Sequence, residues 1–153
     1  MLSIPYIREP RSERYSVVSI RYRCLEQHEH SGHGKYNTET GDRPRLYNTV
    51  ELLKPHTEIA ITEGELDAIA ATQAGVPAVG IPGVTSWREW FTPAFLGYDV
   101  VWILSDGDDP GRVMARNLLN TLPNARHITM PEGVDVNTLV IQGGPSALLE
   151  RMK

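Results

Sequence analysis

The chain has 153 residues, a formal net charge of −4, and 41% hydrophobic and 22% charged residues, which is typical of one soluble globular domain with a proper core. No apolar run approaches the roughly 20 residues of a membrane span, and no signal peptide opens the chain. The single cysteine excludes an intrachain disulfide and a zinc site based on cysteines, so we expect a cytoplasmic protein.

Charge is distributed unevenly along the chain. The balance is +2 up to Arg45 and −6 from Leu46 onward. A basic front and an acidic rear suit a protein that touches a phosphate backbone with one part and binds metal with the other. An ordinary solvated surface explains the same charges equally well.

The first third of the chain predicts an extension in front of a larger domain. Residues 1–14 carry two prolines and mixed charge and predict an arm. Residues 15–26 alternate apolar and polar side chains, which predicts a strand, and 27–45 form a polar loop or hairpin tip. A short helix or turn follows over 45–55, so we expect a basic β-hairpin extension over 15–55.

Residues 56–153 alternate between strand and helix patterns. This alternation predicts an α/β domain with a mainly parallel, four-stranded sheet flanked by helices. The expected strands are 58–62, 77–83, 99–105 and 125–131, and the expected helices are 63–75, 86–97, 110–122, 134–144 and 145–153.

Clusters of acidic side chains follow three of these strands. They are Glu63 with Asp67, Asp106 with Asp108, and Asp135 with the neutral Asn137. Ligands of open α/β sheets gather at the carboxyl ends of strands, and oxygen donors of this kind suit Mg²⁺ or Mn²⁺. Helix capping explains any one of these clusters, but three clusters at successive strand ends favour a metal site.

The segments EGELDAIA, SDGDDPGR and DVNTLV resemble the Toprim domain, in which a glutamate motif precedes an Asp-x-Asp motif. Toprim domains occur in bacterial-type DNA primases, topoisomerases, nucleases and recombination proteins. PRLYNT, IRYR and PEGVDVNTLV are similar to segments of the primases in particular. The resemblance runs from Ser16 to the C-terminus and implies a Toprim fold over 56–153. The chain resembles the Toprim half of a primase core standing alone, an arrangement associated with bacteriophage genomes.

The resemblance also implies roles for the acidic residues. Glu63 corresponds to the Toprim glutamate, which is a catalytic acid or base and a metal position, and Asp106 and Asp108 correspond to the metal-binding catalytic pair. Asp67 and Asp135 correspond to further metal positions. Asn137 departs from the primase Asp-x-Asp form and could bind only through a neutral amide oxygen.

The same resemblance implies a nucleic-acid or nucleotide-binding set, namely Arg21, Arg23, Arg45, Asn48 and Arg112. Arg45 and Asn48 belong to the primase-like PRLYNT segment, and Arg21 and Arg23 could extend its surface. Arg112 could touch substrate or orient a neighbouring carboxylate, and the sequence leaves both roles open.

The implied function is that of a primase catalytic subunit, a nucleotidyltransferase that joins ribonucleoside triphosphates into RNA primers on single-stranded DNA during replication. The chain has no room for the zinc-binding domain, the rest of the core or the helicase-binding domain of a full primase. We therefore expect a second chain to supply the missing parts, with a replicative helicase as a further partner. The expected location is the cytoplasm, that of the bacterial host if the protein is phage-encoded.

Two alternatives remain open. A Toprim-type nuclease would use the same acidic residues with water as the nucleophile, and a non-catalytic accessory subunit would only bind metal and nucleic acid. An aspartate-nucleophile phosphatase is disfavoured because the catalytic region lacks a lysine, and a topoisomerase would need a tyrosine from another domain.

Three histidines, His28, His30 and His33, crowd into one polar, glycine-bearing segment. A zinc site and a polar loop tip both account for this pattern, and Cys24 is the nearest cysteine. The sequence leaves the role of the three side chains open.

Overall fold

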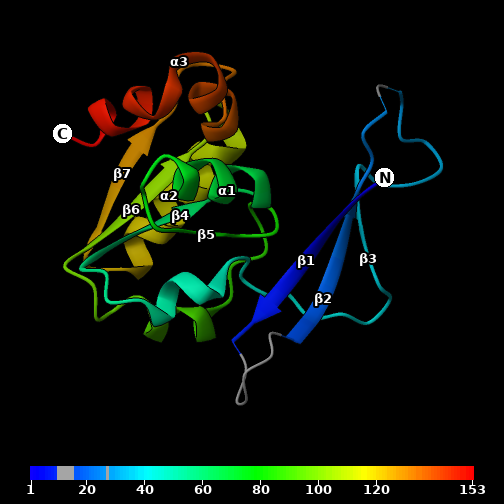
Figure 1. Ribbon diagram of the computed structural model, residues 1–153, viewed down its shortest axis with the longest axis horizontal. Coiled ribbons are helices and arrows are strands. Elements are labelled where there is room, and N and C mark those ends of the chain that lie inside the picture. The colour runs from blue at the N-terminus through cyan, green and yellow to red at the C-terminus, as the bar shows by residue number, and fades with distance from the viewer. Residues whose placement is uncertain (10–15, 27) are drawn as a thin grey trace. The chain divides into compact units, whose positions relative to one another are not determined.

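The computed structural model describes residues 1–9, 16–26 and 28–153, and it divides into two compact units, Met1–Arg43 and Pro44–Lys153 (Figure 1). Each unit has its own sheet and is described by itself. The division falls at Arg43, before the boundary expected at residue 55, because the segment from Pro44 to Asn48 packs with the second sheet.

The N-terminal unit is a three-stranded antiparallel sheet of order β1-β2-β3. Its strands are β1 (Leu2–Arg8), β2 (Ser16–Arg23) and β3 (Tyr36–Thr38). The arm expected over 1–14 is therefore wrong for Leu2–Arg8, where buried Ile4 and Tyr6 alternate with exposed residues. Pro5 is tolerated because β1 is an edge strand. The rest of that expected arm, 10–14, lies outside the described residues.

The C-terminal unit is the expected α/β domain. Its four strands are all parallel, in the order β5-β4-β6-β7. The strands are β4 (Glu58–Thr62), β5 (Ala78–Gly80), β6 (Val100–Ser105) and β7 (Ala125–Thr129). The helices are α1 (Glu65–Gln73), α2 (Asp109–Thr121) and α3 (Val136–Arg151), with short 3-10 helices η1 (Thr49–Leu53) and η2 (Glu89–Ala94).

Two details of the helices follow from proline and glycine. α3 covers both closing helices predicted from the sequence, and it is interrupted at Gly144, whose φ of 71° is followed by Pro145. Around Pro93 the chain forms only the 3-10 turns of η2, where an α-helix in pieces was expected.

Helices cover both faces of the parallel sheet, which is why its central strands are continuously apolar. Ile59 and Ile61 of β4 pack with Met114 and Leu118 of α2 on one face. On the other face, Ala60 packs among side chains of α1 and α3. The small alanines of α1 allow that helix to lie close to the sheet. The sheet is thereby packed on both faces.

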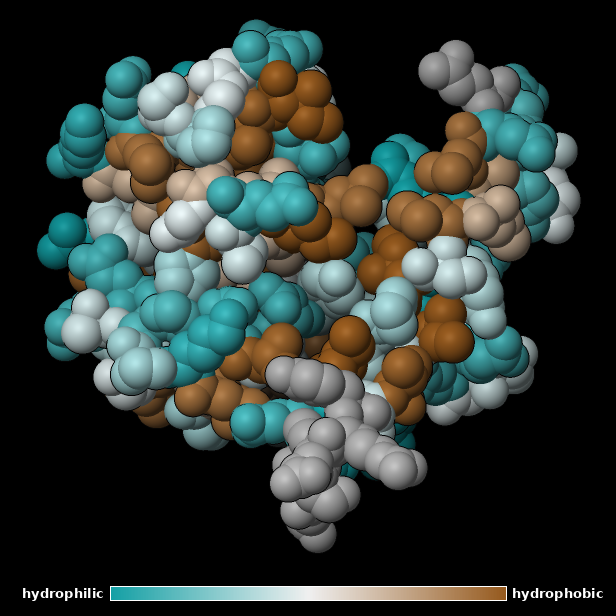
Figure 2. Space-filling view, viewed as in Figure 1, coloured by the Kyte–Doolittle hydropathy of each residue, from teal (hydrophilic) through white to brown (hydrophobic). Residues whose placement is uncertain are grey.

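The surface is of mixed polarity. On the face shown in Figure 2, hydrophilic and hydrophobic residues are intermixed over each unit. No helix in the described ranges combines the length and the apolar character that a bilayer crossing requires.

Candidate metal centre

Two of the predicted acidic residues follow neighbouring strands at the same edge of the sheet. β4 and β6 pair in parallel with Thr62 opposite Leu104, so Glu63 and Asp106 both emerge at the carboxyl edge. Both side chains are partly buried. The topology thus brings together residues that lie far apart in the sequence, as the sequence pattern predicted.

The loop after β6 is held against the loop after β7 by its glycine. The Gly107 N–H donates to the Val134 carbonyl at 3.1 Å, and the Gly133 N–H donates to the Gly107 carbonyl at 3.1 Å. A Cβ atom at Gly107 would lie 1.8 Å from the Pro131 carbonyl oxygen, which is far inside van der Waals contact. Only glycine lets the two loops come this close. Because they do, Asp106 and Asp108 in the first loop lie near Asp135, which follows the second.

Backbone N–H groups orient the other three carboxylates. Asp108 caps α2 by accepting from the Gly111 N–H at 2.8 Å, and Asp135 caps α3 by accepting from the Thr138 N–H at 2.6 Å. Asp67, in the first turn of α1, accepts from the Asn137 N–H at 3.0 Å, a contact that ties α1 to α3. Asn137 therefore contributes its backbone to the placement of an acidic neighbour, a role that its side chain does not reveal.

Burial and neighbouring charges raise the pKa values of Glu63 and Asp106. Burial, followed by the charges of Asp108, Asp67 and Asp135, raises the pKa of Glu63 from 4.5 to about 7. Burial is the main cause that raises the pKa of Asp106 from 3.8 to about 8. The charges of the other four carboxylates add to it, and Asp67 contributes the most among them. These mutual effects place all five carboxylates in one electrostatic cluster.

Two oxygens of this cluster have no protein partner. Glu63 Oε2 and Asp106 Oδ1 are buried and accept no hydrogen bond from any described residue. A buried, unpaired carboxylate oxygen costs free energy that a bound cation would recover. Because all the donors are oxygens and several are charged, the set fits a divalent cation such as Mg²⁺ or Mn²⁺.

The predicted arginines of the N-terminal unit share one face of its sheet. Arg21 and Arg23 alternate along β2, and their guanidinium carbons lie 4.4 and 5.3 Å from the centre of the Tyr36 ring. This stacked arrangement exposes positive charge beside an aromatic ring, a combination suited to nucleic acid. Arg45 belongs to the other unit, where it is partly exposed.

Asn48 and Arg112 both make contacts within the protein. The Asn48 side-chain amide donates to the Ala78 carbonyl at 2.9 Å and to Thr72 Oγ1 at 3.3 Å, and its backbone takes a φ of 59°. Asn48 thereby fastens the turn before η1 to β5. Arg112 Nη2 lies 2.6 Å from Oδ1 of exposed Asp109, and both roles proposed for this arginine stay predictions.

Glu65 is a further acidic residue near this edge that sequence reasoning missed. It is fully buried in the first turn of α1, and its charge contributes to raising the pKa of half-buried Tyr47, after desolvation. Tyr47 in turn forms a β-bridge with Gly80. The signal available was a second glutamate two residues after Glu63, which helix-capping preferences explained without a further role.

The Toprim-like family model matches residues 60–140, more than half of the chain. The Gene 57 protein of Mycobacterium phage D29 is 52% identical over 151 residues, which cover 99% of this chain and 97% of that protein. The DNA primase of Pseudomonas putida is 36% identical over 118 residues, which cover 70% of this chain and 18% of the primase. The chain thus spans under a fifth of that primase.

The fold agrees with these sequence matches. A crystal structure of a DNA primase domain from Pseudomonas aeruginosa superimposes with a TM-score of 0.76 at 28% identity, over 98% of this chain and 49% of that one. The matched region includes both sheets, and the family match contains Glu63, Asp106 and Asp135. The chain therefore belongs to the Toprim-like family, and its Toprim domain is that of a bacterial-type DNA primase.

Proposed function

We propose that the chain is the catalytic Toprim part of a primase, which joins ribonucleotides on a single-stranded DNA template in the presence of Mg²⁺ or Mn²⁺. The observation that carries this proposal is the pair of buried carboxylate oxygens without partners, Glu63 Oε2 and Asp106 Oδ1, inside a primase-type Toprim domain. We also propose that the protein acts in the cytoplasm, which would be the cytoplasm of the bacterial host if the protein is phage-encoded.

In this reaction the primer 3′-hydroxyl oxygen bonds to the α-phosphorus of the incoming nucleotide, pyrophosphate leaves, and the hydroxyl proton is taken up by a base. Asp106 and Asp108 would hold the metal, with Asp67 and Asp135 completing its surroundings. A bound divalent ion supplies charge neutralisation at the phosphates and activation of the hydroxyl. Glu63, with its pKa raised to about 7 in the metal-free protein, is suited to accept and return a proton.

Template contact would come from arginine side chains. Arg21 and Arg23 would bind phosphates of single-stranded DNA while Tyr36 offers a stacking surface. Arg45, which belongs to the catalytic unit, would add a further positive charge. A second chain would supply the remaining primase parts, and a replicative helicase would be a further partner.

The test combines the purified chain with Mg²⁺ or Mn²⁺, single-stranded DNA and labelled ribonucleoside triphosphates, with and without a chain carrying the other primase parts. New oligoribonucleotides that Asp106→Asn reduces by about 100-fold or more would support the proposal, since even residues that only orient metal ligands contribute 10–100-fold. Asp109→Asn is the matched control, because this exposed carboxylate pairs with Arg112 instead of the cluster.

Two results would overturn the proposal. Shortened DNA without new RNA, lost in Asp106→Asn, would identify a Toprim nuclease. Binding of DNA without any product, in both the single chain and the reconstituted mixture, would identify an accessory subunit.

A further inference from the structure

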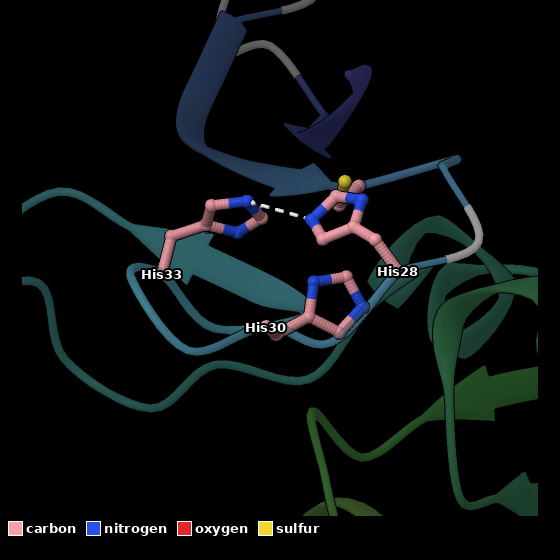
Figure 3. Close-up of side chains that lie close together, drawn as sticks. His28, His30 and His33 are labelled. Atoms are coloured by element: carbon pink, nitrogen blue, oxygen red, sulfur yellow. Dashed lines mark hydrogen bonds between the residues drawn. The ribbon is translucent and has the colours of Figure 1, made fainter.

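A second cluster of metal-binding side chains lies in the N-terminal unit, and neither the acidic centre nor the proposed function uses it. Cys24, His28, His30 and His33 each present one donor atom, and the four atoms lie within 4.8 Å of one another. Figure 3 shows the three imidazole rings turned toward one another. Their ring centres are 4.7 to 5.2 Å apart. All four residues come from the connection between β2 and β3.

Cys24 lies where this connection leaves the β2–β3 ladder. Its N–H donates to the Lys35 carbonyl at 2.9 Å, which extends the β2–β3 ladder beyond the pair Arg23 and Tyr36. The cysteine is also buried and free of any disulfide. One donor is thus fixed by the sheet, while the three histidines follow within a short loop and fold back over it.

The outer nitrogens of two rings face oxygen acceptors. His33 Nδ1 donates to the Gly34 carbonyl oxygen at 3.0 Å, because a carbonyl oxygen only accepts, and this leaves the lone pair of the neutral ring on Nε2. His28 Nδ1 lies 3.5 Å from the exposed Glu26 carboxylate, which is an ion-pair contact. Metal-binding histidines have this same arrangement, in which a carboxylate or carbonyl holds the outer N–H.

The two inner nitrogens point at each other. His28 Nε2 and His33 Nε2 are 3.1 Å apart, within hydrogen-bond distance (Figure 3). A metal ion bound by both nitrogens would replace the proton that they share. A tetrahedral zinc ion with Zn–N bonds of about 2.0–2.1 Å separates its nitrogen ligands by about 3.4 Å, so only a small adjustment of the loop would be needed.

His30 supplies the remaining nitrogen. Its Nδ1 atom is buried and has no hydrogen-bond partner within the described residues. A buried polar atom without a partner is costly, and a ligand bond would satisfy it. The cluster thus contains a buried thiol, two aligned Nε2 atoms and one orphaned Nδ1.

We propose that Cys24, His28, His30 and His33 bind one Zn²⁺ ion in a closed, tetrahedral, structural site. One sulfur and three nitrogens form a donor set that zinc prefers, and four protein ligands leave no open position for catalysis. The site differs from the acidic centre, whose oxygen donors suit Mg²⁺ or Mn²⁺. The zinc would fix the loop directly beside the face that carries Arg21, Arg23 and Tyr36, so it would stabilise the shape of that basic surface.

Cobalt substitution tests the site, because Cys24 is the only cysteine of the chain. Protein freed of metal by a chelator and titrated with Co²⁺ should show the strong visible bands of tetrahedral cobalt and a thiolate-to-cobalt band in the near ultraviolet, and both should saturate at one Co²⁺ per chain. Cobalt held by the oxygen donors of the acidic centre would give no thiolate band. Cys24→Ser should lose the thiolate band, and His33→Ala should weaken the binding that these bands report about 100-fold or more. Both His127→Ala, which alters an exposed histidine of the other unit, and Asp106→Asn, which alters the acidic centre, should keep both bands at unchanged affinity.

A measurement on the unchanged chain keeps the test valid if a variant does not fold. Zn²⁺ at equimolar concentration should slow alkylation of the Cys24 thiol at least tenfold, and excess chelator should restore the rate. Cobalt binding without a thiolate band, alkylation that zinc does not slow, or Zn²⁺ binding lost in Asp106→Asn would each overturn the proposal. The primase proposal stands or falls independently, since none of these readouts measures nucleotide transfer.

Discussion

The two clusters of potential metal ligands are built by opposite routes. The acidic cluster draws Glu63, Asp106 and Asp135 from the ends of three parallel strands, so the sheet brings together residues separated by tens of positions. The donors of the Cys24–His33 cluster all come from the connection between β2 and β3, whose two ends are joined by the hydrogen bond from the Cys24 N–H to the Lys35 carbonyl. The first is a product of topology, and the second is a product of local chain geometry.

The difference in donors follows the difference in construction. Oxygens on rigid strand ends keep their positions without metal at the cost of mutual repulsion, which the raised pKa values of Glu63 and Asp106 record. Nitrogen and sulfur donors on a loop need a metal to hold the loop itself. We therefore expect the acidic edge to be preformed and to lose stability from its charges, and the histidine loop to gain order on binding.

The largest expected effect comes from breaking the acidic edge at Gly107. Gly107→Ala places a Cβ atom 1.8 Å from the Pro131 carbonyl oxygen and disturbs the two hydrogen bonds that Gly107 makes with Val134 and Gly133. Urea unfolding followed by tryptophan fluorescence should report a loss of about 3 kcal/mol, at the upper end for an overpacked site. Gly97→Ala, where the added atom meets nothing within 4 Å, should change stability little. Equal losses in the two variants would contradict the steric argument.

Replacing the carboxylate of Asp106 by an amide tests whether charge repulsion destabilises the acidic edge in the absence of metal. Asp106→Asn should raise the metal-free stability by about 2 kcal/mol at neutral pH, because it removes a group whose pKa is raised to about 8, with allowance for solvent screening at a half-buried side chain. The same change should reduce the gain from saturating Mg²⁺, which is about 2.7 kcal/mol at 100 times Kd for the unchanged protein.

Asp108 is a less suitable site for this change. It is exposed and caps α2, so Asp108→Asn keeps the cap and alters a charge that water already screens. Asp109→Asn serves as the control for Asp106→Asn and should leave both the metal-free stability and the Mg²⁺ response unchanged. A Mg²⁺ response that survives Asp106→Asn would argue against the metal centre.

Much of the acidic edge could be predicted from the sequence because it depends on few assumptions. Apolar strands alternating with helices imply a parallel sheet, and parallel strands bring Glu63 and Asp106 to one edge whatever the details of packing. The capping roles of Asp108 and Asp135 were also within reach, since both precede helices. The sequence could not predict which carboxylates would be buried without partners and which would accept hydrogen bonds, because this depends on burial. Only the structure distinguishes the two orphaned oxygens from the three carboxylates held by backbone N–H groups.

The N-terminal unit was harder to predict for physical reasons. Pro5 argued against a strand, but its cost vanishes on the edge of a sheet, and edge position is a property of the fold. The approach of Cys24 to three histidines depends on how one loop turns, which spacing alone does not determine. Asn48 was assigned to the nucleotide surface from its motif, yet its amide points into contacts with Ala78 and Thr72.

The two regions should respond to pH in opposite directions. Between roughly pH 4 and pH 8 the folded state holds protons on Glu63 and Asp106 that the unfolded state releases, so the metal-free C-terminal unit should lose stability as pH rises through this window. Burial, with the charges of His28, His33 and Lys35, lowers the pKa of His30 from 6.5. The N-terminal unit should therefore lose stability as pH falls through that lowered pKa.

Spectroscopy can separate these two responses. Trp87, Trp90 and Trp102 all belong to the C-terminal unit, so tryptophan fluorescence during urea unfolding reports that unit, while far-ultraviolet circular dichroism reports both. Saturating Mg²⁺ should flatten the pH dependence of the fluorescence transition. A fluorescence midpoint that rises from pH 5 to pH 8 without metal would contradict the repulsion assigned to the acidic edge.

The smallest expected effect concerns the basic face beside the histidine loop. Arg21→Ala or Arg23→Ala should weaken binding of single-stranded DNA and should reduce the slope of log K against log salt concentration by about 0.7 for each phosphate that the variant no longer neutralises. Arg116→Ala, an exposed arginine on α2, is the matched control and should leave that slope unchanged. Removing metal with a chelator should mimic part of the Arg21→Ala effect if zinc holds the loop next to this face. A uniform effect of all three substitutions would mean that DNA responds to net charge alone, and the basic face would then have no special role.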